Sequence, residues 1–232
     1  MNNTTFTYNN NTYVFHYDSS DPSELWCIDE IVRDNDYLLD KFVGLESKTL
    51  FDIGANCGVA TIILAKQNPL STIYSFEPDP RVFHVLKLNT EANNLQNVIL
   101  FNAAVSKKGI SHLELCIHPQ YSGGNTTYSD EKHFHDFFNS TVKTFQVDAK
   151  SLDQLIDQYN ISEIELLKID CEGGEYDILY DSVAFTQNKI KNMVGEFHNL
   201  RYNNKVNSTA EELIQYSKKY VSGIFAVRIL TV

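Results

Sequence analysis

The stretch Phe51-Asp52-Ile53-Gly54-Ala55-Asn56-Cys57-Gly58 decides the fold of this chain. Residues 49–53 form a short, mostly apolar run with β-branched residues at both ends, which predicts a buried strand. Gly54 and Gly58 mark a turn, and residues 59–66 predict a helix. A strand that passes through a tight glycine turn into a helix is the nucleotide-binding corner of a doubly wound α/β sheet.

The details of this turn indicate which ligand it holds. A dinucleotide site has the pattern Gly-x-Gly-x-x-Gly, whereas this turn has Asp52, Gly54, Asn56 and Gly58 and lacks the middle glycine. A glycine at the first position lets a ligand approach the backbone. An acid at the strand end is unfavourable beside a pyrophosphate and favourable beside an ammonium group. The turn therefore favours S-adenosylmethionine, a nucleoside that carries an amino acid, with a strand–turn–helix that binds no ligand as the alternative.

Length and charge restrict the class of protein. The chain has 232 residues, of which 43% are hydrophobic, enough for one α/β domain over residues 1–232. Its 19 basic and 30 acidic residues give a net charge of -11, which opposes binding to nucleic acid or to an anionic membrane. No long apolar run or secretory signal is present, and the four cysteines show no close pairing. We therefore expect a cytoplasmic protein with free thiols, whose oligomeric state the sequence leaves open.

The first 45 residues are expected to form a helical cap. Residues 1–11 are polar and predicted to be frayed, and the alternation in residues 12–17 predicts a short edge strand. A helix is predicted to begin at Asp21-Pro22-Ser23-Glu24, with proline just inside the helix and acids in the first turn. This region packs either over the cofactor pocket or as a plain cap on the sheet.

The second strand is predicted over residues 72–76 and ends at Glu77-Pro78-Asp79-Pro80. A carboxylate at this strand end can accept both ribose hydroxyls of an adenosine, which favours Glu77 as a cofactor residue. Helix capping by Glu77 or Asp79 is the alternative, and Asp79 followed by Pro80 is itself typical of a helix start.

A third strand and an insertion follow. Residues 98–101 predict the strand, and Asn102-Ala103-Ala104 places amide and small side chains where an adenine edge would lie. Alternation in residues 110–117 and 141–147 predicts an inserted antiparallel strand pair. Residues 118–140, which include the stretch between these strands, are long, polar, aromatic and rich in glycine, so they form either a lid over the acceptor or a disordered loop.

Acidic and imidazole side chains close the fourth and fifth strands. Residues 164–169 are almost continuously apolar, as expected for a central parallel strand, and Asp170 and Glu172 follow. Residues 190–197 predict the next strand, which is followed by His198. The carboxyl ends of parallel strands meet at one edge, so these side chains are candidates for catalysis.

His198 is the candidate best matched to act as a general base near neutral pH. Glu172 could orient its imidazole or bind substrate hydroxyls. The alternatives are a hydrogen-bonded histidine at a strand end and a glutamate that caps a helix. Two carboxylates and an imidazole could also hold Mg²⁺, but we assign no metal because hard cations usually need more oxygen ligands.

Three blocks of sequence together resemble the FkbM family of S-adenosylmethionine-dependent methyltransferases: FDIGANCG, then IYSFEPDP with NAAVS, then SLDQLI, IELLKIDCEGGEYDIL and GEFH. The resemblance covers residues 49–200, which we take as the core. It implies a class I methyltransferase, Rossmann-like fold: a mostly parallel, twisted, seven-stranded sheet with helices on both faces. It also implies O-methylation of a sugar or a hydroxylated natural product. Only one clear strand follows the last predicted helix, so the last strand of that sheet is where this chain departs from the family.

The resemblance also implies roles for the site residues. The methionine end would contact Asp52, Gly54, Ala55, Asn56 and Gly58, the ribose would contact Glu77 and Pro78, and the adenine would contact Asn102, Ala103 and Ala104. Asp170 would lie beside the methyl group, and His198, Glu172 and Asp170 form the predicted catalytic set. The acceptor would be a small molecule or a glycan. Two other classes stay open: an NAD-type oxidoreductase, disfavoured by the missing glycine, and a non-catalytic nucleoside- or partner-binding module, disfavoured by the acids at the strand ends.

Overall fold

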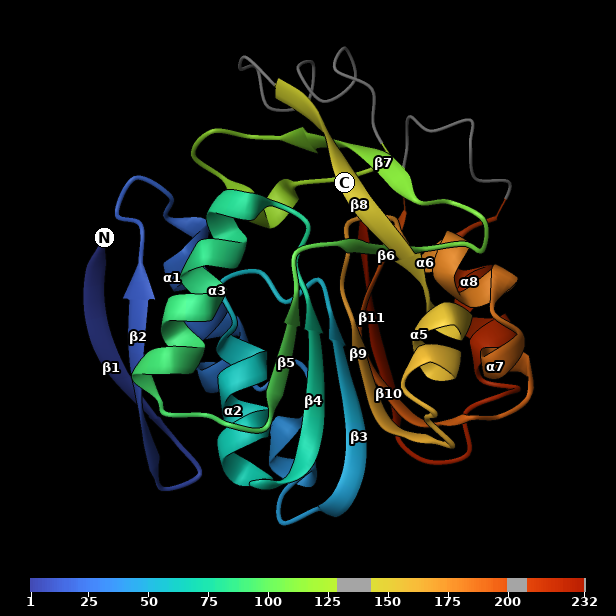
Figure 1. The fold of residues 1–232 in the computed structure, drawn as a ribbon, viewed down its shortest axis with the longest axis horizontal. Helices are drawn as coiled ribbons and strands as arrows, with labels where there is room; N and C mark the ends of the chain where they lie inside the picture. The colour runs from blue at the N-terminus through green and yellow to red at the C-terminus, as the bar shows by residue number, and fades with distance from the viewer. Residues whose placement is uncertain (129–142, 200–207, 232) are drawn as a thin grey trace.

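The main sheet has six strands, all parallel, in the order β11-β10-β9-β3-β4-β5 (Figure 1). The computed structural model describes residues 1–128, 143–199 and 208–231 of the chain. The strand bounds are β3 (Glu46–Ile53), β4 (Leu70–Phe76), β5 (Val98–Phe101), β9 (Ile164–Ile169), β10 (Ile190–Asn199) and β11 (Phe225–Thr231). This arrangement confirms the predicted α/β class with a parallel sheet at its centre.

Helices cover both faces of this sheet because its strands are apolar on both sides. Phe51 and Ile53 of β3 face one core, whereas Leu50 faces the other. The helices on the two faces are α2 (Val59–Gln67) and α3 (Pro80–Ala92) on one side, and α5 (Leu152–Gln158), α6 (Glu175–Asp181), α7 (Val183–Thr186) and α8 (Ala210–Ser217) on the other. Among the described helices, none is long and apolar enough to cross a membrane.

The N-terminal region differs from its prediction. Residues 1–11 are not frayed, because β1 (Asn2–Tyr8) pairs with β2 (Asn11–Tyr17) as an antiparallel hairpin beside α3. The two loop residues Asn9 and Asn10 have φ of 45° and 61°, the left-handed conformation that tight hairpin turns require. The edge strand predicted over residues 12–17 is confirmed as β2, in which Tyr13 and Phe15 are fully buried, whereas β1 was missed because its residues are mostly polar.

The rest of the cap is helical but irregular. It contains α1 (Ser23–Ile28), a π-helical turn over Asp29–Arg33 and a 3₁₀ turn over Leu39–Lys41. This region therefore combines a strand hairpin with short helical turns.

The predicted insertion forms a second sheet across the carboxyl-end side of the main sheet (Figure 1). Its strands are β6 (Ala104–Ser106), β7 (His112–Ile117) and β8 (Lys143–Ser151), and β7 pairs antiparallel with β8, as predicted. A short 3₁₀ turn, η3 (Ser122–Gly124), follows β7. The predicted lid over residues 118–140 lies partly outside the described residues, which resume at 143.

The last strand requires a correction to the seven-stranded sheet that the resemblance implied. β11 pairs parallel with β10 at the sheet edge, with Met193 opposite Phe225. Within the described residues, the main sheet therefore has six strands.

Candidate active site

A cavity lies over the carboxyl ends of β3, β4, β9 and β10. Eight of the predicted cofactor residues line it: Gly54, Ala55, Asn56, Glu77, Pro78, Ala103, Ala104 and Asp170. Its opposite end is lined by Asp170, Glu172 and Glu196, and the cap contributes Trp26 and Tyr37. The residues that follow these strands therefore meet at one edge of the sheet, and residues of the N-terminal region line the same cavity.

The glycine turn is held by close packing against the neighbouring strand. Gly54 has φ +74°, and a Cβ built there would lie 1.6 Å from the carbonyl oxygen of Asp170. No other residue fits this position, because the clash is with backbone that cannot move aside. Gly58 has φ +94°, and its Cβ would meet Leu86 Cδ1 at 2.4 Å. Gly54 lines the cavity and Gly58 does not, so Gly58 serves the packing of α2 against α3.

Asp52 lies beneath the turn and does not line the cavity. It is fully buried, accepts a hydrogen bond from Thr61 Oγ1 at 2.6 Å and pairs with Lys168 Nζ at 3.2 Å. Lys168 Nζ in turn donates to the carbonyl oxygen of Gly54 at 2.6 Å. Burial lowers the pKa of Lys168, but Asp52 and Asp170 outweigh it and raise the pKa above its usual value. Asp52 therefore positions the turn through Lys168 and offers no direct contact to an ammonium group in the cavity.

Glu77 is a buried acid that lines the cavity. Its carboxylate accepts hydrogen bonds from the backbone N–H of Asn56 at 3.0 Å and of Asp79 at 2.8 Å. Burial raises the pKa of Glu77 to about 8, although these two N–H groups act in the opposite direction. Asp79 caps α3, as predicted. Asn102 does not line the cavity, and its amide donates to the carbonyl oxygens of Glu77 and Pro78, so it shapes the loop that carries them.

The opposite end of the cavity carries a group of carboxylates. Asp170 Oδ2 accepts a hydrogen bond from the Tyr37 hydroxyl at 2.6 Å, which ties the cap to the end of β9. Glu172 has φ +51°, a left-handed conformation that costs a residue with a side chain about 1–3 kcal/mol. Its carbonyl oxygen accepts a hydrogen bond from Thr126 Oγ1 at 2.6 Å, which helps to hold this backbone. Burial raises the pKa of Glu172, and the neighbouring His198 opposes that rise.

His198 lies behind these carboxylates and is fully buried. Its Nδ1 lies 3.1 Å from Glu175 Oε1 and its Nε2 lies 3.4 Å from Glu172 Oε1. Burial alone would lower the pKa of His198, but Glu172 and Glu175 outweigh it and hold the pKa well above its usual value. His198 does not line the cavity, so its imidazole has no direct contact with an acceptor bound there. This geometry favours the carboxylates that line the cavity over His198 as the general base, the role that the sequence predicted for it.

Comparison with known proteins places the chain in a family. The FkbM methyltransferase domain matches residues 52–222. The chain belongs to the FkbM methyltransferase family. The methyl donor of this family is S-adenosylmethionine, so the resemblance seen in the sequence is confirmed and the NAD-type alternative loses its basis.

Individual relatives of this FkbM-family chain are distant. Methyltransferase 1 of Beauveria bassiana (strain ARSEF 2860) is 31% identical over 141 residues, which cover 56% of this chain and 56% of the relative. The 31-O-demethyl-FK506 methyltransferase FkbM of Streptomyces tacrolimicus is 23% identical over 190 residues, which cover 74% and 73% of the two chains. Among solved structures, M. jannaschii TYW2 in complex with AdoMet has 24% identity and a TM-score of 0.30, covering 43% of this chain and 42% of that chain. The chain spans little more than half the length of the first of these relatives.

Two residues of the FkbM-family site were missed in the sequence. Glu175 opens α6, where an acid is explained by the helix dipole alone, yet its carboxylate binds His198 and the backbone N–H of Cys171. Tyr37 lies 133 positions from Asp170, and no local pattern links them. Only the fold brings such partners together.

Proposed function

We propose that this chain transfers the methyl group of S-adenosylmethionine to a hydroxyl oxygen of a small molecule or glycan. One observation supports this most directly: a single cavity joins the Gly54 turn and Glu77 to the carboxylates of Asp170, Glu172 and Glu196. The first group suits a nucleoside that carries an amino acid, and the second suits a hydroxyl that must lose its proton.

The charge of the cavity suits the donor. Five carboxylates line it, those of Glu30, Glu77, Asp170, Glu172 and Glu196. Among its described lining residues the one lysine or arginine is Lys168, which is already bound to Asp52 and to the carbonyl of Gly54. When bound, S-adenosylmethionine supplies an electrophilic methyl group on a positively charged sulfur. Glu77 would accept the ribose hydroxyls, while Ala103 and Ala104 leave room for the adenine.

The chain's own residues have three tasks in such a reaction. Asp170 and Glu172 accept the hydrogen bond of the acceptor hydroxyl and so aim its oxygen at the donor. As the new O–C bond forms, the hydroxyl proton passes to one of these carboxylates and the electron pair of the broken C–S bond stays on sulfur. The cap, through Trp26 and Tyr37, covers the cavity and limits access of water.

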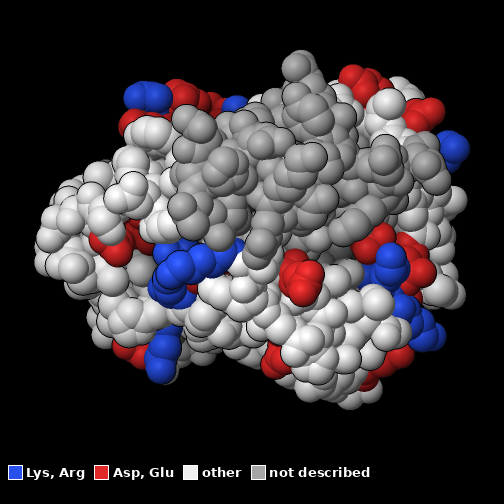
Figure 2. Space-filling model, turned by 90° about the horizontal axis from the view of Figure 1, so that it is seen from above, with Lys and Arg blue, Asp and Glu red and all other residues white. Residues whose placement is uncertain are grey.

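The surface suits a small neutral or cationic acceptor rather than a nucleic acid. On the face in Figure 2, the Lys and Arg side chains of the described residues form small separate groups, most of them beside acidic side chains. Nucleic-acid binding needs clustered basic residues. Trp26 is half exposed at the cavity, and its ring meets Tyr121 edge-on at 5.8 Å, so the pair offers an aromatic surface to a sugar ring or another flat acceptor. All four cysteines are free thiols, which suits the cytoplasm as the proposed location.

The proposal is tested with methyl-labelled S-adenosylmethionine and a panel of sugars, hydroxylated natural products and amines. We expect label in a product ether that resists mild base, and its loss in the Glu172→Gln variant. Label in an amine instead would contradict O-methylation. Tight binding of S-adenosylmethionine without turnover of any acceptor would favour a non-catalytic binding module.

A further inference from the structure

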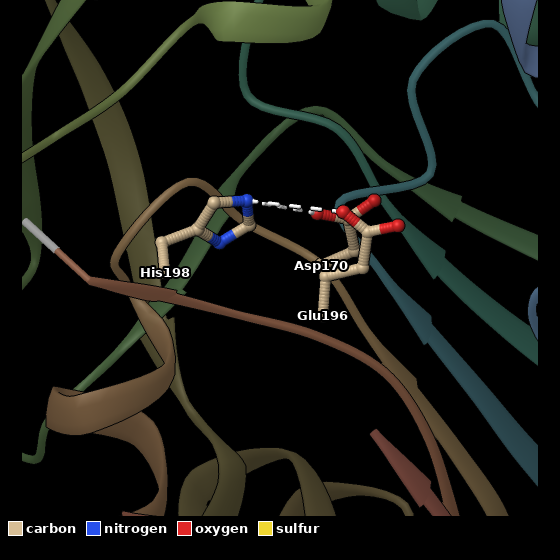
Figure 3. Close-up of side chains that lie close together, drawn as sticks. All are labelled: Asp170, Glu196 and His198. Atoms are coloured by element: carbon tan, nitrogen blue, oxygen red, sulfur yellow. Dashed lines mark ion pairs between the residues drawn. The ribbon is translucent and has the colours of Figure 1, made fainter. Parts of the chain in front are cut away.

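We propose that Asp170, Glu196 and His198 form a binding site for a divalent first-row transition metal ion at the acceptor end of the cavity (Figure 3). The part of this inference that concerns binding stands on the geometry alone. The role of the ion, to hold and activate the acceptor hydroxyl, rests on the proposed function.

The three side chains converge because of where the strands end. Glu196 and His198 are two positions apart on β10, so they project to the same side of the sheet. Asp170 follows β9, the parallel neighbour of β10. His198 Nε2 lies 3.9 Å from Asp170 Oδ1 and 4.0 Å from Glu196 Oε2, and one ligand atom of each residue lies within 4.8 Å of the others. Metal–ligand distances of about 2.0–2.2 Å then require only small side-chain rotations.

Each ligand is aimed by a partner on its other atom. Tyr37 donates to Asp170 Oδ2, Arg228 pairs with Glu196 Oε1, and Glu175 Oε1 lies 3.1 Å from His198 Nδ1. The last contact fixes the ring so that Nε2 faces the carboxylates. A carboxylate on the far nitrogen is the usual outer partner of a metal-bound histidine.

An unsatisfied buried atom points independently to a ligand at this place. His198 is fully buried, and among the described residues its Nε2 has no hydrogen-bond partner of ordinary geometry; the nearest acceptor is Glu172 Oε1 at 3.4 Å. A buried polar atom left unpaired is costly. Four carboxylates surround this one imidazole, so a divalent cation would satisfy Nε2 and neutralise part of their charge; they belong to Asp170, Glu172, Glu175 and Glu196.

The donor set decides the class of ion. One imidazole nitrogen with two carboxylates suits Mn²⁺, Fe²⁺ or Zn²⁺, whereas Mg²⁺ and Ca²⁺ prefer sites made of oxygen alone. The sequence led us to expect no metal, and the proposed site replaces that expectation. Asp170 and Glu196 line the cavity, so the open coordination positions face the acceptor. An ion there would polarise the bound hydroxyl and ease the loss of its proton.

The test uses Mn²⁺ and the chelator-treated full chain. We expect one Mn²⁺ per chain by electron paramagnetic resonance, with coupling to an imidazole nitrogen in the pulsed spectrum. The coupling should disappear in His198→Gln, and the affinity should fall at least about tenfold in Glu196→Gln. His84→Gln is the matched control, because His84 is exposed on α3, and it should bind as the wild type does.

Three results would overturn the metal site: no stoichiometric binding of Mn²⁺ or Zn²⁺ at millimolar concentration, binding without nitrogen coupling, or unchanged affinity in the folded variants. If His198→Gln does not fold, Asp170→Asn carries the test, since Asp170 is partly exposed and its loss should also weaken binding at least about tenfold. Full methyl transfer by the chelator-treated protein would overturn the role of the ion while leaving the proposed function intact. Metal binding without methyl transfer to a hydroxyl would overturn the proposed function while leaving the metal site intact.

Discussion

The two ends of the cavity are built in different ways. The end that we propose for the cofactor is formed by short turns that directly follow β3, β4 and β5, and the backbone does most of the shaping, as at Gly54 and in the N–H groups that hold Glu77. The end that we propose for the acceptor is formed by side chains from distant segments, in which Asp170 meets Tyr37 and His198 meets Glu175. Geometry set by the backbone can be recognised from a local sequence pattern, whereas a network of charged side chains from distant segments cannot.

The two ends also meet at one point. The carbonyl oxygen of Asp170 occupies the space where a side chain at position 54 would lie. Lys168 links them as well, because it pairs with Asp52 and hydrogen bonds Gly54 from within β9. A change at this junction should therefore damage both ends, and a change elsewhere should damage one.

The largest effect is expected from Gly54→Ala. The new Cβ cannot be accommodated without moving β9, so we expect a loss of at least about 4 kcal/mol in the free energy of unfolding and loss of cofactor binding. Gly109→Ala is the matched control, because Gly109 also has a positive φ, of +85°, but open space around its Cβ. It should lose only about 1–2 kcal/mol, the cost of a left-handed alanine. Denaturant unfolding measures both, and equal losses would show that strain, not contact, matters at Gly54.

The next largest effect is expected from Glu172→Gln at the acceptor end. Removal of the carboxylate should lower turnover by about 10²–10⁴-fold, the usual worth of general base assistance. The affinity for S-adenosylmethionine should change less than about twofold, because the side chain of Glu172 pairs with His198 and not with the Gly54 turn or Glu77. Steady-state kinetics and calorimetry measure the two quantities, with exposed Glu163→Gln as the control. Normal turnover would remove Glu172 from the reaction.

Sequence reasoning located the first end almost completely. The strand, glycine turn and helix over residues 49–66, Glu77 and the small residues 103–104 all follow from local patterns. Residues 54–56 of the turn, Glu77 and residues 103–104 line the cavity, whereas Gly58 does not. It misjudged Asp52, because a strand-end acid can face either a ligand or a buried lysine, and only the fold shows which. It could not show that His198 lies behind the carboxylates and does not line the cavity, since this position depends on partners such as Glu175 that only the fold brings close.

A smaller effect is expected from Glu77→Ala at the cofactor end. Loss of charge-assisted hydrogen bonds to the ribose should weaken binding of S-adenosylmethionine by about 1–3 kcal/mol, while turnover at saturating donor stays near normal. Glu163→Ala serves as the control for a glutamate removed from the surface. Calorimetry on folded protein decides the matter, and unchanged affinity would remove Glu77 from the ribose role.

The smallest effect is a pH dependence at the same residue. Burial raises the pKa of Glu77 to about 8 in the free protein, and ribose hydroxyls beside a cationic donor should favour its charged form and lower that pKa. Affinity for S-adenosylmethionine should then rise as the pH rises towards 8 and level off above it, by about fivefold between pH 7 and 8. The donor's own amino group titrates in this range, so the Glu77→Ala variant provides the baseline. Parallel pH profiles for the two proteins would contradict the assignment.

The central claim is that the cavity beside the Gly54 turn is built for a nucleoside that carries an amino acid. Calorimetry tests it most directly, by titration of the folded chain with S-adenosylmethionine, its demethylated product and NAD. We predict one site per chain for S-adenosylmethionine and for its product, and no heat of binding for NAD at the same concentrations. Binding of NAD in place of S-adenosylmethionine, or no binding of any of the three, would contradict the account.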